Sequence, residues 1–184
     1  MKLGIIGFGN MGQALAKGVI QAMENVEIAV VEKDPEKARQ AEGIEQVRLY
    51  SNADQTFFHF AEYTVIAIKP QDLPELFADI AEYTKGKKII SIAAGKTIGY
   101  FQRNLKTEQV VRFMPNLAAG IGKAVVGVAF PAKCDNDLQE AAFIVAEALG
   151  SPVELPERSM SAITGLSGSG IAYVFQFIHS LAMG

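Results

Sequence analysis

The sequence predicts an α/β protein built on a doubly wound parallel sheet, followed by the start of an all-α domain. Strand and helix patterns alternate from the first residues onward. The strands are continuous apolar runs, as expected for parallel strands that helices cover on both faces. The 184 residues suffice for one sizeable α/β domain and a fragment of a second. We expect the first domain to span residues 1–157 and the incomplete helical domain residues 158–184.

Composition narrows the function classes. Hydrophobic residues make up 49% of the chain and charged residues 20%, which is typical of a globular protein. The net charge of −3 and the scattered basic residues argue against a nucleic-acid partner. Cys134 is the only cysteine, so no intramolecular disulfide can form, and a cytoplasmic location fits best. His59 and His179 lie far apart in the sequence, so we expect no metal site.

The first half of the chain predicts three strand-and-helix pairs. The clearest boundary is at Asp34 and Pro35, an N-cap residue followed by proline at the first helical position. The expected elements are a strand at 3–6, a helix at 10–24, a strand at 26–31, a helix at 34–42, and a less sharply bounded strand and helix within 47–61.

The second half continues the alternation. Asp72 and Glu75 match a capping box for the next helix, and Gly150 is a typical helix stop. The expected elements are a strand at 64–68, a helix at 72–84, a strand at 88–92, a short helix at 97–105, strands at 110–113 and 124–130, a helix at 136–149, and an edge strand at 153–155.

The last segment, 171–183, predicts a helix with apolar residues around most of its circumference. Residues 159–184 contain no charged side chain, a length that could span a bilayer. Glycine and polar residues fill the first half of that stretch, so we favour burial against other protein helices over a membrane. Those helices could belong to a second subunit or to a later part of a longer chain, and we favour the longer chain.

A glycine-rich motif predicts a dinucleotide site. Residues Gly7, Phe8, Gly9, Asn10, Met11 and Gly12 match G-x-G-x-x-G between the first strand and the first helix, the context that a Rossmann domain requires. The first glycine allows the tight turn, the second lets the backbone approach a pyrophosphate, and the third lets helix and strand pack closely. The alternative is a glycine-rich turn without a ligand.

Glu32 and Lys33 bear on the choice of cofactor. Glu32 lies 20 residues after Gly12, where an acid accepts hydrogen bonds from the ribose 2′-hydroxyl of NAD. Lys33 could instead pair with the 2′-phosphate of NADP. Both side chains could also be ordinary solvated charges. The sequence therefore leaves NADH and NADPH open.

Five segments in order resemble pyrroline-5-carboxylate reductase, over essentially the whole chain. They are the loop and helix at 7–18 (GFGNMGQALAKG), then AIKPQ at 67–71, SIAAG at 91–95, RFMPN at 112–116, and ITGLSGSGIAYVF at 163–175. The resemblance implies reduction of the cyclic imine 1-pyrroline-5-carboxylate to L-proline with NADPH or NADH. It also implies a homodimer or higher homo-oligomer through the C-terminal helical, dimerisation domain.

The resemblance also implies site residues. The cofactor would contact Asn52, Ala67, Ile68, Lys69, Pro70 and Ala93, and the substrate Met114, Asn116, Ser167, Gly168, Ser169 and Gly170. The backbone N–H groups of the last four precede an apolar helix and could hold a carboxylate. Ordinary roles exist too: Lys69 as a charge at a strand end, Asn116 as a turn residue and Ser169 as a helix cap.

The chain departs from the family at three places. Ile171 stands where the family commonly has proline, Leu117-Ala118 stands where it often has Thr-Pro, and the family's later helices are missing. No acid–base pair is visible, so the catalytic residue is unknown. A hydroxyacid dehydrogenase of the 6-phosphogluconate type is a rival, disfavoured because no lysine follows Lys133. A non-catalytic cofactor-binding relative is the other alternative.

Overall fold

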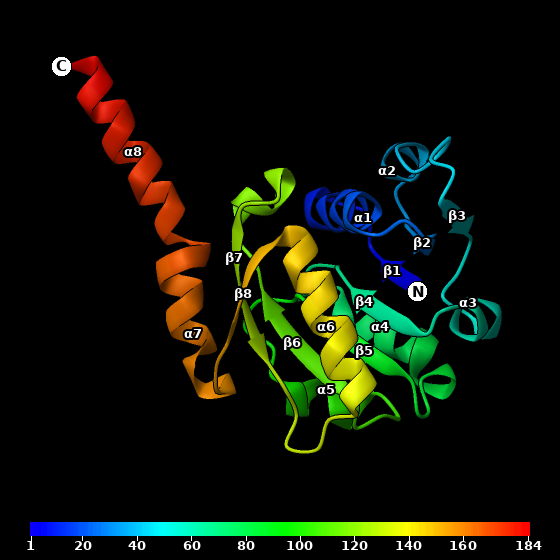
Figure 1. Ribbon diagram of the computed structural model, residues 1–184. Coiled ribbons are helices and arrows are strands. Elements are labelled where there is room, and N and C mark those ends of the chain that lie inside the picture. The colour runs from blue at the N-terminus through cyan, green and yellow to red at the C-terminus, as the bar shows by residue number, and fades with distance from the viewer.

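The computed structural model describes residues 1–184, which form one eight-stranded sheet with helices on both faces (Figure 1). The strand order is β3-β2-β1-β4-β5-β6-β7-β8, and β1 and β4 are neighbours at the point where the chain changes direction along the sheet. All neighbouring strands are parallel except β6 and β7, which are antiparallel. The strands are β1 (Lys2–Ile6), β2 (Glu27–Val31), β3 (Val47–Tyr50), β4 (Tyr63–Ile66), β5 (Lys88–Ser91), β6 (Val110–Met114), β7 (Ala124–Ala129) and β8 (Gly150–Glu154).

Two apolar cores lie on opposite faces of this sheet. One core packs α1 (Asn10–Ala22) and α6 (Asn136–Leu149) against the strands. The other packs α3 (Gln55–Phe60), α4 (Leu73–Ile80) and α5 (Ile98–Asn104). Each central strand supplies apolar side chains to both cores, because successive residues of a strand point to opposite faces of the sheet. The predicted doubly wound sheet is thus confirmed, with one antiparallel step.

The capping residues predicted for two helices have different outcomes in the structure. Asp34 caps α2 (Pro35–Arg39) as predicted, since its carboxylate accepts hydrogen bonds from the Glu36 and Lys37 N–H groups. The capping box at Asp72 is wrong: that side chain makes no capping hydrogen bond. Asp72 itself has helical dihedrals, and Glu75 directs its carboxylate to Lys33, so neither side chain bonds the backbone of the first turn.

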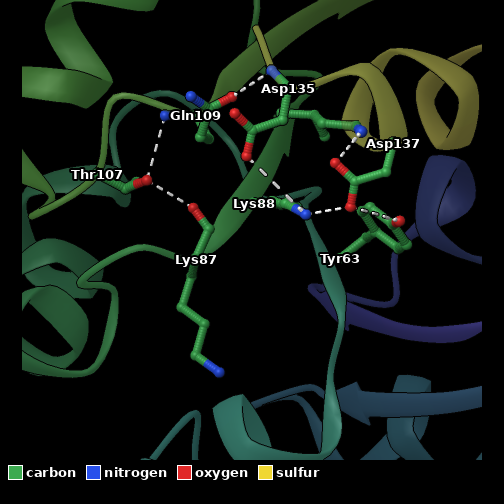
Figure 2. A network of polar contacts seen from close by, with 8 residues as sticks. Tyr63, Lys87, Lys88, Thr107, Gln109, Asp135 and Asp137 are labelled. Atoms are coloured by element: carbon green, nitrogen blue, oxygen red, sulfur yellow. Dashed lines mark hydrogen bonds and ion pairs between the residues drawn. The ribbon is translucent and has the colours of Figure 1, made fainter.

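A polar network anchors the start of α6 at the amino-terminal edge of the sheet (Figure 2). Lys88 at the start of β5 bonds the carboxylate of Asp137, and the Tyr63 hydroxyl donates to the same carboxylate at 3.4 Å. The Gln109 side chain accepts from the Asp135 N–H at 2.9 Å. Because ligands of open α/β sheets bind at the opposite, carboxyl-terminal edge, this network is structural.

The last 27 residues of regular structure form one continuous helix from Glu157 to Met183. Its first part lies beside the sheet and its last part projects away from it (Figure 1). Its parts are η3 (Glu157–Ser159), α7 (Met160–Ile163), a π-helical turn η4 (Thr164–Gly168) and α8 (Gly170–Met183). No residue of α8 is buried, and the helix is long and apolar enough to cross a membrane by length and composition. Ser169 lies at the N-cap position of α8, as its ordinary role predicted, but its side chain makes no capping hydrogen bond, and its N–H continues the preceding turn by bonding Thr164 O at 2.8 Å.

Candidate cofactor and substrate site

The three glycines of the loop after β1 differ in what surrounds them. Gly7 has a φ of +97°, and a Cβ there would lie 2.8 Å from Ala67 O. A Cβ on Gly12 would lie 2.2 Å from Gly7 O, so only glycine lets α1 approach the loop. A Cβ on Gly9 would meet no atom within 4 Å. Gly7 and Gly12 therefore serve the fold, whereas Gly9 borders open space, as a backbone that must approach a pyrophosphate requires.

The loop opens a 13-residue helix whose first turn offers free donors. The Gln13 N–H, which bonds Gly9 O at 3.0 Å, closes the first hydrogen-bonded turn of α1. The N–H groups before it have no intrahelical acceptor, and no acidic side chain lies in this first turn. The residues present thus fit a dinucleotide pyrophosphate, which helix N-termini bind through their N–H groups and dipole.

Glu32 is fixed at the end of β2 beside this loop. Its Oε2 accepts from the Phe8 N–H at 2.5 Å, and its Oε1 accepts from the Asp34 N–H at 2.9 Å. Lys33, next in the chain, turns to α4 and pairs with Glu75, with 2.5 Å between Nζ and Oε1. This hydrogen bond raises the pKa of Lys33 and lowers the pKa of Glu75. Of the two candidate cofactor-selecting side chains, Glu32 is therefore held by backbone N–H groups, whereas Lys33 is held by another side chain.

A cavity of about 580 Å³ lies where the carboxyl ends of β1, β2 and β4 meet. Backbone hydrogen bonds hold these ends together, from the Gly7 N–H to Val31 O and from the Ala67 N–H to Ile6 O, both 2.8 Å. Five of the residues expected to contact the cofactor line this cavity, namely Gly7, Glu32, Lys33, Asn52 and Ile68. The structure thus brings together residues from four separate sequence segments.

The other expected cofactor residues do not line this cavity. The loop and the first turn of α1 contain Phe8, Gly9, Asn10, Met11 and Gly12. The turn after β4 contains Ala67, Lys69 and Pro70. Lys69 is exposed, and its carbonyl accepts from the Asp72 N–H at 3.0 Å. Ala93 is buried after β5, and its N–H bonds the Ser91 hydroxyl at 3.2 Å. Ala93 therefore shapes the edge of the sheet.

A second group joins the end of β6 to the π-helical turn. The Asn116 side chain donates to the Ser167 hydroxyl oxygen at 3.0 Å, and its own oxygen accepts from the Ala118 N–H at 3.2 Å. A Cβ on Gly168 would lie 3.0 Å from the Met114 Cε. The structure therefore gathers four of the six expected substrate residues. Ser169 is exposed and its N–H is already bonded within the helix, so it does not offer the free donor that the sequence suggested.

Sequence reasoning missed a stripe of acids on the cavity wall. Asp72, Glu75 and Asp79 line the cavity from the start of α4 and along it, and Asp54 lines it from the N-cap of α3. The first three are spaced at i, i+3 and i+7, the spacing of one helix face. That periodicity is the signal that would have found them.

Cys134, the only thiol, adds no nucleophile to this set. Burial is the main reason why the pKa of the Cys134 thiol is raised to about 11, so the thiol stays protonated at neutral pH. It lies near Asp135 and Asp137, at the edge of the sheet opposite the cavity.

Comparison with known proteins identifies the family of this chain. Residues 2–95 match the family described as NADP oxidoreductase, coenzyme F420-dependent. The whole chain is 36% identical to a pyrroline-5-carboxylate reductase of Methanosarcina acetivorans, of which it spans 69%. The chain belongs to the pyrroline-5-carboxylate reductase family. It is also 33% identical to the family member of Synechocystis, and it spans 63% of the longer Mycobacterium tuberculosis member.

Solved structures of this family share the whole fold. The Streptococcus pyogenes reductase superposes with a TM-score of 0.86 at 26% identity, covering all of this chain and 69% of that one. The Plasmodium falciparum reductase, solved with NADP bound, gives 0.84 at 25% identity, covering 98% of this chain and 67% of that one. A prephenate dehydrogenase of Aquifex aeolicus shares only the fold, at 14% identity and a TM-score of 0.75. Members of the pyrroline-5-carboxylate reductase family thus extend about half as far again as this chain.

Proposed function

We propose that this chain binds NADH or NADPH across the loop from Gly7 to Gly12 and takes part in the reduction of 1-pyrroline-5-carboxylate to L-proline. The observation that carries the proposal is the open space above Gly9, at the β1–β4 switch point, where the free donors of α1 begin. Family membership supports the substrate. When bound, the nicotinamide would supply the hydride that the C=N carbon accepts.

The chain's own residues bind the cofactor and the substrate and orient them. The loop and the first turn of α1 hold the pyrophosphate through backbone N–H groups. The end of β2 and the residues after β3 and β4 border the adenosine half, which fits the cavity. Asn116 and Ser167 offer an amide and a hydroxyl to the polar groups of the substrate, and Met114 offers an apolar wall. A cyclic imine nitrogen takes up a proton from water readily, so these residues need only position it.

We propose further that a second copy of the chain covers α8, making a homodimer or larger homo-oligomer in the cytoplasm. Tyr173, Phe175, Phe177 and Leu181 are more than half exposed, and isolated apolar faces of this size mark interfaces. Against a lipid partner stand Glu157 and Arg158 at the helix start and the polar π-helical turn. The division at 157/158 stays part of this proposal. Every residue from 172 to 184 is exposed, whereas Met160 packs on the first domain.

A turnover assay of the wild-type protein and of a Ser167 variant tests the proposal. The purified protein is assayed for oxidation of NADH and of NADPH with pyrroline-5-carboxylate, and its native mass is measured alongside. We expect turnover, and a loss of about tenfold in kcat/KM for Ser167→Ala, because one hydrogen bond in the site is removed. Ser151→Ala, on the exposed edge strand β8, is the matched control. Cofactor binding without turnover would favour a non-catalytic relative.

A further inference from the structure

We infer that this chain selects NADH over NADPH, and that the carboxylate of Glu32 is the residue that selects. The inference rests on the proposed function and refines it, since it concerns the same cofactor site. Its first observation is that both oxygens of this carboxylate are held by backbone N–H groups, Oε2 by Phe8 at 2.5 Å and Oε1 by Asp34 at 2.9 Å. The charge is therefore fixed at the end of β2, on the wall of the cavity.

The second observation is the charge of that wall. Five carboxylates line the cavity against a single ammonium group, that of Lys33. The carboxylates belong to Glu32, Asp54, Asp72, Glu75 and Asp79. A ribose 2′-hydroxyl can donate a hydrogen bond to a fixed carboxylate, whereas a 2′-phosphate brings two further negative charges to the same place. Like charges in a partly enclosed cavity repel more strongly than they do in bulk water.

Lys33 does not reverse this balance. Its Nζ pairs with Glu75 at 2.5 Å, and Asp72 and Asp79 add to the acidic surroundings. The side chains of Lys33 and Glu75 are 70% and 72% exposed, so their pair is weak and Lys33 is free to turn. A Lys33 that turned to a 2′-phosphate would neutralise only part of its charge and would leave Glu75 unpaired. Glu32, held by the backbone, cannot turn away. The fixed negative charge of Glu32 therefore outweighs the mobile positive charge of Lys33.

Calorimetric titration of the purified protein with NADH and with NADPH, without pyrroline-5-carboxylate, tests the inference. We expect NADPH to bind about 10-fold more weakly than NADH at low ionic strength, with the ratio shrinking as salt screens the charges. Glu32→Gln removes the charge and also one of the two oxygens that accept backbone N–H groups, so we compare the two cofactors within the variant and expect the preference for NADH over NADPH to shrink about tenfold. Glu45→Gln, an exposed site near the opposite edge of the sheet, is the matched control and should keep the wild-type ratio.

Equal or tighter binding of NADPH by the wild-type chain would overturn the inference. An equal change for both cofactors in Glu32→Gln would also overturn it, because the carboxylate would then act by position and not by charge. If neither cofactor binds, the proposed function fails as well. Since the titration contains no substrate, a chain that binds NADH selectively but does not turn over supports the inference while contradicting the proposed reaction.

Discussion

The guanidinium of Arg112 on β6 meets the carboxylate of Glu157 at the start of the C-terminal helix, with 3.3 Å between Nη1 and Oε1. The Arg112 side chain is only 7% exposed, and its Nε has no hydrogen-bond partner. The same Glu157 oxygen accepts from the Ile98 N–H at 2.6 Å, at the start of α5. One carboxylate thus ties the projecting helix to two elements of the first domain.

Glu157→Gln should destabilise the protein by about 2–3 kcal/mol, because it leaves a buried guanidinium without a counter-charge. Glu157 itself is 30% exposed, which keeps the expected loss below that of a fully buried pair. Urea unfolding measures the change, and Glu154→Gln on exposed β8 serves as the control. A loss no larger than the control's would show that solvent, and not Glu157, compensates Arg112.

Apolar periodicity located nearly every strand and helix, because burial on one or two faces dictates where apolar side chains can stand. The direction of β7 was not predictable in the same way, since a continuous apolar strand has the same pattern in either direction. The continuous helix through the π-helical turn was missed because glycines at 165, 168 and 170 indicate a break. Gly168 lies against Met114, a tertiary contact that explains the small residue at that position.

The candidate site also contains residues that the sequence predicts and contacts that it does not. The glycine loop and Glu32 were predictable because a short motif fixes both the backbone shape and the distance to the end of the next strand. The bond between Asn116 and Ser167 joins segments 51 residues apart, and no local pattern encodes it. The partner that Lys33 finds in Glu75 likewise depends on how α4 packs beside β2.

Gly9→Ala and Gly12→Ala should separate binding from folding. A Cβ on Gly9 meets no protein atom within 4 Å, so stability should change by less than about 1 kcal/mol. The methyl group would occupy the space of the pyrophosphate, so NADH affinity should fall by at least about tenfold. A Cβ on Gly12 would lie 2.2 Å from Gly7 O, so that variant should instead lower the unfolding midpoint. Unchanged NADH affinity in Gly9→Ala would refute the placement of the cofactor.

The Lys88–Asp137 pair should make stability depend on pH at both extremes. The hydrogen bond from Lys88 lowers the pKa of Asp137 from its ordinary value, so its contribution is fully present above that ordinary value and is lost as the pH falls through the folded-state pKa. The same bond raises the pKa of Lys88 above 10.5, so this contribution is lost at alkaline pH.

Asp137→Asn tests this relationship. The Asp137 side chain is 53% exposed, so solvent screening limits the loss to about 1 kcal/mol or less. Urea midpoints should differ between wild type and variant by a constant amount from pH 6 to pH 9, and the difference should shrink below the unfolded-state value of about 3.9. A difference that persists unchanged at pH 2 would mean that packing, and not charge, accounts for it.

The exposed face of α8 should govern self-association. Val174, Ile178 and Leu181 share one face by their spacing, while Gln176 and Ser180 share another, where the Ser180 hydroxyl bonds Gln176 O at 2.9 Å. Ile178→Glu should therefore convert an oligomer to a monomer by light scattering, because it would bury an unpaired charge in the interface. The Ile178 side chain is 56% exposed within one chain, so the fold itself should be unaffected. Ser180→Glu adds the same charge to the other face and should leave the oligomer intact, whereas dissociation by both variants would point to a general effect of charge on α8.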